Sequence, residues 1–124
     1  MNHNNLNQNI KYSQGDILRI DLDTVKGHEQ GKKRPCLIVS NDYYNQKCNT
    51  AIIVPISSAE KYNRTFYLES GLFVRIPENP FIHGTILLQH IRSIDLKIRM
   101  LSKPLFKLPE EYMQDIRSRM NNFF

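Results

Sequence analysis

The amino-acid sequence predicts a small α+β domain in which a twisted antiparallel sheet carries one C-terminal helix and one or two short helices. Three observations support this fold class. Short apolar or alternating segments are separated by turn residues, which is typical of β-strands. One stretch near the C-terminus repeats its apolar residues at three- and four-residue steps, which indicates a helix. The chain has 124 residues, the size of a single domain.

The first two strands are expected on either side of a basic loop. Residues 17–22 carry apolar side chains at every second position, which predicts a half-buried strand. Residues 34–41 contain the unbroken run Cys-Leu-Ile-Val, which predicts a strand buried on both faces. Free cysteines are usually buried, so Cys36 is expected to pack in the core. The loop 23–33 carries two glycines and several cations.

A third strand is expected over residues 50–57, and one helical turn is expected in the connection 42–49. Pro55 has no backbone N–H to donate, so we expect it to mark an edge or a bulge. Later strands are expected at residues 64–69, 72–76, 85–94 and 101–108, and 85–94 is the longest of them. Residues 95–100 are compatible with a short helix.

The clearest helix is predicted over residues 109–122, with Pro109 at its start. Acidic residues in its first turn and arginines near its end complement the helix dipole. Its apolar stripe, expected to pack against the sheet, consists of Met113, Ile116, Met120 and Phe123. The asparagine-rich residues 1–14 are expected to form a flexible tail, which leaves residues 15–124 as a single domain.

Positive charge is concentrated in two separate segments. The whole chain has a formal charge of +5. Residues 26–34 hold four cations and one anion, and residues 92–107 hold five cations and one anion. Two basic segments can flank one groove for a polyanion, and they can equally be solvated faces.

A guanidinium and a hydroxyl are expected to meet at the open end of the hairpin formed by residues 34–41 and 50–57. The symmetric register pairs residues whose numbers sum to 91, which sets Arg34 opposite Ser57. The planar guanidinium donates two parallel hydrogen bonds to phosphate oxygens, and a hydroxyl donates one more. This pair therefore suits a phosphodiester. The plainer alternatives are an arginine paired with an acid and a strand-end hydroxyl.

Several sequence blocks together resemble the MazF/PemK family of toxin endoribonucleases. The resemblance covers roughly residues 14–121, and the Gly27-His28-Glu29-Gln30 and Arg34-Pro35 blocks are its most specific part. The remaining blocks are Gly15-Asp16-Ile17, Ser40-Asn41, Ile53-Val54-Pro55-Ile56-Ser57 and Leu88-Gln89-His90-Ile91-Arg92-Ser93-Ile94-Asp95. The resemblance implies an SH3-like barrel with short helices.

The resemblance also implies a sequence-specific, metal-independent endoribonuclease that cleaves single-stranded RNA, such as mRNA, as the toxin of a toxin–antitoxin module. Arg34 matches the family's catalytic arginine, and Ser57 stands where relatives usually carry threonine. His28 and Glu29 are candidates for proton transfer. The residues expected to contact RNA are Gln30, Lys32, Lys33, Ser58, Gln89, His90 and Arg92. Relatives usually show an acid and then glutamine at the Gln89-His90 position, and many carry another residue at His28.

Two other functions stay open at this stage. One is a non-enzymatic toxin of the same fold that binds a topoisomerase such as gyrase, and the exposed-looking Phe123-Phe124 end is compatible with it. The other is a simple basic RNA-binding barrel. Tyr43, Tyr44, Tyr62, Phe66 and Phe81 offer rings on which unpaired bases can stack.

No cofactor and no metal are expected, because the histidines and cysteines lack ligand spacing. Attack by the RNA 2′-hydroxyl needs no metal-bound water, so the expected products are a 2′,3′-cyclic phosphate and a 5′-hydroxyl. The expected partners are single-stranded RNA, a cognate acidic antitoxin and a second copy of the chain. No membrane span and no signal layout are recognisable, so a cytoplasmic protein is expected.

Overall fold

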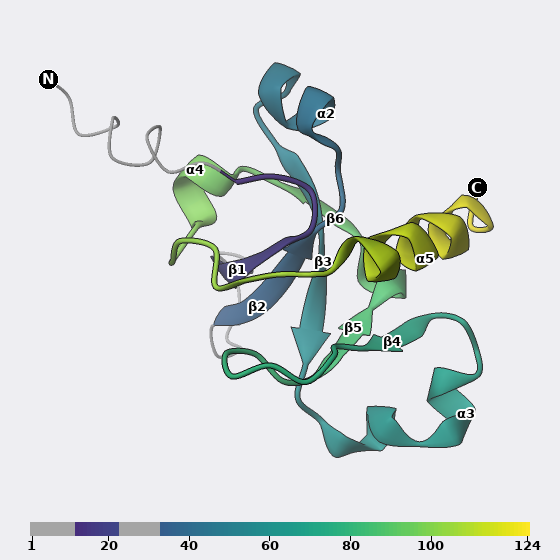
Figure 1. Ribbon diagram of the computed structural model, residues 1–124. Helices are drawn as coiled ribbons and strands as arrows, with labels where there is room; N and C mark the ends of the chain where they lie inside the picture. The colour runs from purple at the N-terminus through teal and green to yellow at the C-terminus, as the bar shows by residue number, and fades with distance from the viewer. Residues whose placement is uncertain (1–11, 23–32) are drawn as a thin grey trace, which may run out of the picture.

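The computed structural model describes residues 12–22 and 33–124, and every strand pair in these ranges is antiparallel. The strands form one curled sheet in the order β4-β5-β3-β2-β1-β7, with β6 also pairing with β3 (Figure 1). They are β1 (Asp16–Asp21), β2 (Lys33–Ile38), β3 (Ala51–Ser57), β4 (Phe73–Arg75), β5 (Thr85–Leu87), β6 (Arg92–Ile94) and β7 (Phe106–Lys107). The predicted α+β class with a barrel-like antiparallel sheet is confirmed.

Alternating residues of the central strands supply two hydrophobic clusters, because successive side chains of a strand point to opposite faces. Ile17 lies in the cluster that contains buried residues of helix α5 (Glu110–Asn121). Its neighbour Leu18 lies in the cluster that contains Leu96 of the short helix α4 (Leu96–Arg99). Adjacent residues of β2 divide between the clusters in the same way, as expected for a strand buried on both faces.

Helix α5 begins directly after Pro109, which occupies the cap position just outside the helix. Met113 and Ile116 are buried against the sheet, and Met120 packs at the margin of the same cluster. Phe123 lies beyond the last helical residue and is exposed, so the apolar stripe ends at Met120 and does not include Phe123 as predicted. The long C-terminal helix itself is confirmed.

The strand predicted at residues 64–69 is wrong. This segment instead forms the helix α3 (Thr65–Leu68), which directly follows the 3₁₀ turn η1 (Glu60–Asn63). Its β-favouring aromatic residues pack on one another instead of pairing with a strand. Tyr62 and Tyr67 both contact the ring of Phe73 in β4. Tertiary packing has overridden the local β-propensity here.

The long strand predicted at residues 85–94 is interrupted. The 3₁₀ turn η2 (Leu88–His90) separates β5 from β6, and both short strands pair with the same edge of β3. Residues 51–53 pair with β6 and residues 56 and 57 pair with β5, so Pro55 falls in the gap between the two ladders. Pro55 thus lies inside a central strand, where one ladder is interrupted, rather than at an edge of the sheet.

The remaining elements agree with the predictions to different degrees. Helix α2 (Asp42–Lys47) is the predicted turn between the second and third strands, capped by Asn41. The strand predicted at 101–108 is limited to the two residues of β7. Residues 1–11 of the expected tail lie outside the described residues, and Gln14 donates to the Val39 carbonyl at 2.7 Å. Among the described helices, none has the length and apolar character needed to cross a membrane.

Gly84 should be intolerant of a side chain. Its φ of +146° is unfavourable for other residues, and a Cβ would lie 2.6 Å from the Ser57 carbonyl oxygen. Gly71 is a matched control, because it has φ +87° but no atom within 4 Å of its would-be Cβ. We expect Gly71→Ala to cost about 1–2 kcal/mol of unfolding free energy, and Gly84→Ala to cost clearly more. Urea denaturation of both variants measures this, and equal losses would contradict the predicted clash.

Candidate active site

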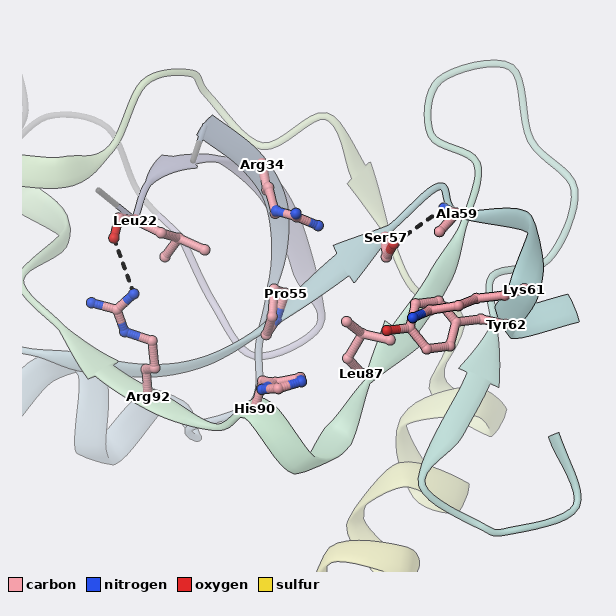
Figure 2. A pocket seen from close by; sticks show the side chains of 10 residues that line it. All are labelled: Leu22, Arg34, Pro55, Ser57, Ala59, Lys61, Tyr62, Leu87, His90 and Arg92. Atoms are coloured by element: carbon pink, nitrogen blue, oxygen red, sulfur yellow. Dashed lines mark hydrogen bonds between the residues drawn. The ribbon is translucent and has the colours of Figure 1, made fainter. Parts of the chain in front are cut away.

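A cavity of about 450 Å³ lies where β2, β3, η1 and η2 meet. We call it the Tyr62 cavity. Its lining residues are Leu22, Arg34, Pro55, Ser57, Ala59, Lys61, Tyr62, Leu87, His90 and Arg92 (Figure 2). A second hollow of about 710 Å³, the Phe81 cavity, shares Arg34, Ser57 and Ala59 with the first. The polar side chains of Arg34 and Ser57 therefore stand between two adjoining cavities.

The hairpin register explains how Arg34 and Ser57 come together. In β2 and β3, Cys36 pairs with Pro55, and the next two pairs continue with numbers that sum to 91. The predicted register is confirmed, and extending it by two residues sets Arg34 across from Ser57. Figure 2 shows the Arg34 guanidinium reaching from β2 into the space beside Ser57. Opposed residues share a face of the sheet, so both side chains reach the same cavity.

Ser57 ends β3 with its hydroxyl held in a defined direction. The residue is 7% exposed, and its Oγ accepts a hydrogen bond from the Ala59 N–H at 3.1 Å. This bond turns the chain out of the strand and towards η1. Because the bond uses only a lone pair of Oγ, the hydroxyl hydrogen is still free to donate.

The turn η2 carries His90 into the cavity, and β6 starts with Arg92 just after it. Arg92 Nη1 donates to the Leu22 carbonyl at 3.1 Å, which anchors one edge of the guanidinium. In Figure 2 the imidazole of His90 lies across Pro55 from Arg34. The break between β5 and β6 is therefore what brings a histidine to this site.

The sequence and the fold both match one family. A sequence model of the PemK-like, MazF-like toxins of type II toxin–antitoxin systems matches residues 13–124. This chain belongs to that family.

Relatives and solved structures agree with the assignment. Endoribonuclease PemK of Escherichia coli is 31% identical over 110 residues, which cover 86% of this chain and 77% of the relative. Endoribonuclease toxin ChpB of Escherichia coli (strain K12) is 30% identical over 112 residues, covering 89% and 91%. These names do not favour the alternative of a topoisomerase-binding toxin.

Two solved structures show the fold. MazF from Deinococcus radiodurans matches with a TM-score of 0.68 at 23% identity, covering 91% of this chain and 97% of that chain. An endoribonuclease in complex with its cognate antitoxin, from a mycobacterial species, matches with a TM-score of 0.67 at 19% identity, covering 90% and 93%.

The two cavities of this MazF-like chain are strongly cationic. Their described lining residues include no Asp or Glu and five Lys or Arg side chains, which are Arg19, Lys33, Arg34, Lys61 and Arg92. Among the described residues, Arg34 forms no ion pair with an acid; the cations of the ion pairs there are Lys107, Arg117 and Arg119. The surface is therefore complementary to a polyanion.

The structure brings together only part of the predicted site. Lys33 and Ser58 line the Phe81 cavity, whereas Gln89 is exposed on η2 and lines neither cavity. His28, Glu29, Gln30 and Lys32 lie outside the described residues. Of the basic segment 92–107, only Arg92 reaches these cavities, and Lys107 is ion-paired with Asp16 instead.

Sequence reasoning missed Lys61 and Arg19. Lys61 lies in the irregular turn η1, where no periodicity signals its direction. Arg19 could have been found, because it alternates with buried residues of β1 and pairs with Pro35 beside Arg34. Among the five aromatic residues considered for stacking, only Tyr62 and Phe81 line these two cavities. Within the described ranges, no group of three or more His, Cys, Asp or Glu side chains is placed to hold a metal ion.

Cys36 should be unreactive although it lies two residues after Arg34. Burial raises the pKa of its thiol to about 12, against the opposing effect of Arg34, Arg92 and Arg19. The thiolate is the reactive form, so the folded protein should present only the exposed Cys48 to an alkylating reagent near neutral pH. Mass spectrometry should find one modified cysteine in the native protein and two after denaturation. Rapid modification of native Cys36 would contradict this assignment.

Proposed function

We propose that this protein is an endoribonuclease toxin that cleaves single-stranded RNA, such as mRNA, at specific sequences. The observation that carries the proposal is the convergence of Arg34 and the Ser57 hydroxyl in a cavity lined by cations and by no described acid. Family membership supports it, because relatives 30–31% identical are named endoribonucleases. The toxin would act in the cytoplasm, where mRNA is found, through a single domain formed by residues 15–124.

The proposed reaction is a transesterification within the RNA strand. The 2′-oxygen forms a bond to the neighbouring phosphorus while the bond from phosphorus to the 5′-oxygen breaks. Arg34 would hold two phosphate oxygens through its planar guanidinium and stabilise the charge that builds up on them. Ser57 would donate its free hydroxyl hydrogen to a phosphate oxygen. Each donor aimed at developing charge is typically worth about 10²–10³ in rate.

Two proton transfers complete the reaction. The 2′-hydroxyl loses a proton to a base, and the departing 5′-oxygen gains one from an acid. Histidine suits both tasks because it readily changes protonation state near neutral pH. His90 lines the Tyr62 cavity with Arg34 and Ser57. His28 and Glu29 are the other candidates for proton transfer, and Gln30 and Lys32 of the same loop are candidates for RNA contact.

Arg34→Ala should abolish most of the RNA cleavage without unfolding the protein. Arg34→Lys should recover little, because a point charge cannot make the bidentate contact. We expect kcat to fall by at least about 10²-fold in both variants. Arg75→Ala is a matched control, since Arg75 is an exposed arginine on β4 that lines neither cavity. Cleavage of single-stranded RNA and thermal melting are measured on the same preparations, and full activity in Arg34→Ala would refute the mechanism.

The products should be a 2′,3′-cyclic phosphate and a 5′-hydroxyl, and cleavage should continue in excess EDTA. The nucleophile belongs to the substrate, so a deoxyribose on the 5′ side of the cut should block cleavage. Phosphate contacts should keep the binding of that substrate nearly unchanged. Mass spectrometry of the fragments is the measurement. A 3′-hydroxyl with a 5′-phosphate, or loss of activity with EDTA, would show that the mechanism is wrong.

We also propose that the protein forms a homodimer and binds a cognate acidic antitoxin over the RNA-binding face. The support is the cationic, acid-poor lining of the two cavities and the antitoxin complex known for the mycobacterial endoribonuclease. An acidic, partly disordered segment can fold onto such a surface as it binds. RNA and antitoxin should therefore compete in a titration. Simultaneous binding of both, or a monomer in light scattering at micromolar concentration, would contradict the respective half of this proposal.

A further inference from the structure

Arg34 and Ser57 stand between two cavities, and each cavity contains one aromatic side chain. Tyr62 lines one of them, and Phe81 lines the other. A phosphodiester always joins two nucleosides, so a site that cleaves it needs space on both sides of the phosphate. The two volumes, about 450 and 710 Å³, fall in the ~300–1,000 Å³ range of ligand-binding pockets.

We propose that the Tyr62 and Phe81 cavities hold the two nucleosides that flank the scissile phosphate, and that Tyr62 is the stacking platform for the base in its cavity. This inference rests on the proposed endoribonuclease function and adds to it the position of the RNA strand. It assigns base recognition to two residues that lie outside the predicted basic loop at residues 23–33.

Packing from behind holds the Tyr62 ring in place. The ring stacks on Phe73 with 5.1 Å between centroids and 20° between planes, and it meets the Tyr67 ring edge-on at 5.2 Å. Phe73 is 7% exposed and belongs to β4, which pairs with β5. The platform is therefore fixed to the sheet, so a base that stacks on it does not have to order a mobile side chain.

Lys61 places a cation over this platform. Its Nζ lies over the Tyr62 ring, 5.0 Å from the ring centroid. In Figure 2 the Lys61 amino group and the Tyr62 hydroxyl both point towards the middle of the cavity. A base that stacks on Tyr62 would take the place of the flexible, exposed Lys61 side chain over the ring and would bring its own phosphate within reach of that lysine. Ring faces combined with cations are the usual means of holding single-stranded nucleic acid.

Phe81 is presented differently but is also well supported. Its ring is 64% exposed, on the loop between β4 and β5. Asn79 braces this loop, because its side chain accepts from the N–H groups of Phe81 and Ile82 and donates to the carbonyls of Pro77 and Ile82. A large exposed ring on a braced loop beside Ser58 and His83 is suited to hold a base rather than to fill the core.

The chain contains a matched control for Tyr62. Tyr43 on helix α2 is 71% exposed and also has a lysine over its ring, with Lys47 Nζ 5.6 Å from the centroid. Tyr43 lines neither of the two cavities. A general effect of losing a surface tyrosine or a cation–π pair should therefore appear in Tyr43→Ala as well, whereas loss of the proposed platform should not.

The test uses a pool of short single-stranded RNAs with randomised bases, and sequencing of the fragments gives the base preference on each side of the cut. Tyr62→Ala should flatten the preference at one flanking nucleotide and lower kcat/KM roughly 5- to 100-fold, mainly through KM. Tyr62→Phe retains the ring and should therefore keep the base preference that Tyr62→Ala loses, and Tyr43→Ala should behave as wild type. Phe81→Ala should flatten the preference at the nucleotide on the other side. Unchanged preferences, or both variants affecting the same nucleotide, would overturn the proposal.

Two further measurements cover the remaining outcomes. If Tyr62→Ala fails to fold, Tyr62→Leu against Tyr62→Phe makes the same comparison with the bulk retained. If the wild type cleaves no RNA, the proposed function fails, and the subsites are judged by anisotropy with a fully 2′-O-methylated RNA pool, which cannot be cleaved. Weaker binding by the Tyr62→Leu and Phe81→Ala variants, but not by Tyr43→Ala, would uphold the two subsites. Equal binding by all variants would overturn them.

Discussion

The central strand β3 has to pair along both of its edges, and the interruption of one edge at Pro55 determines where the cavity forms. β2 covers one edge without a break beside Pro55, whereas the other edge is shared by β6 and β5. Proline has no backbone N–H to donate to a neighbouring strand. No hydrogen bond from residue 55 is therefore lost where β3 changes its partner from β6 to β5. Opposite this gap, the segment that joins β5 to β6 forms the turn η2. This turn brings His90 to the cavity that Arg34 and Ser57 also line. One local feature of the backbone thus supports the position of three polar side chains.

The charge distribution at this site has a cost for the unbound protein. Five Lys or Arg side chains surround the two cavities, and no described Asp or Glu lines them. Like charges held together without counter-ions oppose folding, although water and salt screen most of the repulsion between exposed groups. The positive charges also act on the buried Cys36. Burial raises the pKa of its thiol, and Arg34, Arg92 and Arg19 act in the opposite direction. Such an arrangement is expected where a polyanion is bound. Binding favours many positive charges at the site, whereas stability of the unbound protein favours fewer of them.

Support for the site comes from behind it as well as from its rim. The aromatic cluster of Tyr62, Tyr67 and Phe73 joins η1 and α3 to β4, and β4 pairs with β5, which leads directly into η2. The elements between residues 60 and 90, which lie next to Ser57, are therefore connected to one another by aromatic packing and strand pairing. Gly84, directly before β5, approaches the Ser57 carbonyl so closely that no larger residue fits there.

The sequence by itself determined the features that depend on local spacing. These are the antiparallel hairpin with its register, the short helix at 42–47, the C-terminal helix and the family, whose motifs are contiguous. Alternation and helical periodicity are set by neighbouring residues, and a symmetric hairpin has few possible registers, so these features can be read without long-range contacts. Extended by two residues, the same register places Arg34 across from Ser57, and both residues line the Tyr62 cavity.

Only the tertiary structure decided the rest. Residues 64–69 favour a strand by composition, but the segment is helical and the ring of Tyr67 packs against Phe73. The division of residues 85–94 depends on Pro55, some thirty residues away in the sequence, where β3 changes partners. The position of Lys61 at the cavity could not be predicted, and Tyr62 could not be singled out from the five aromatic residues considered for stacking. An irregular turn has no period, and its direction is set by what it packs against.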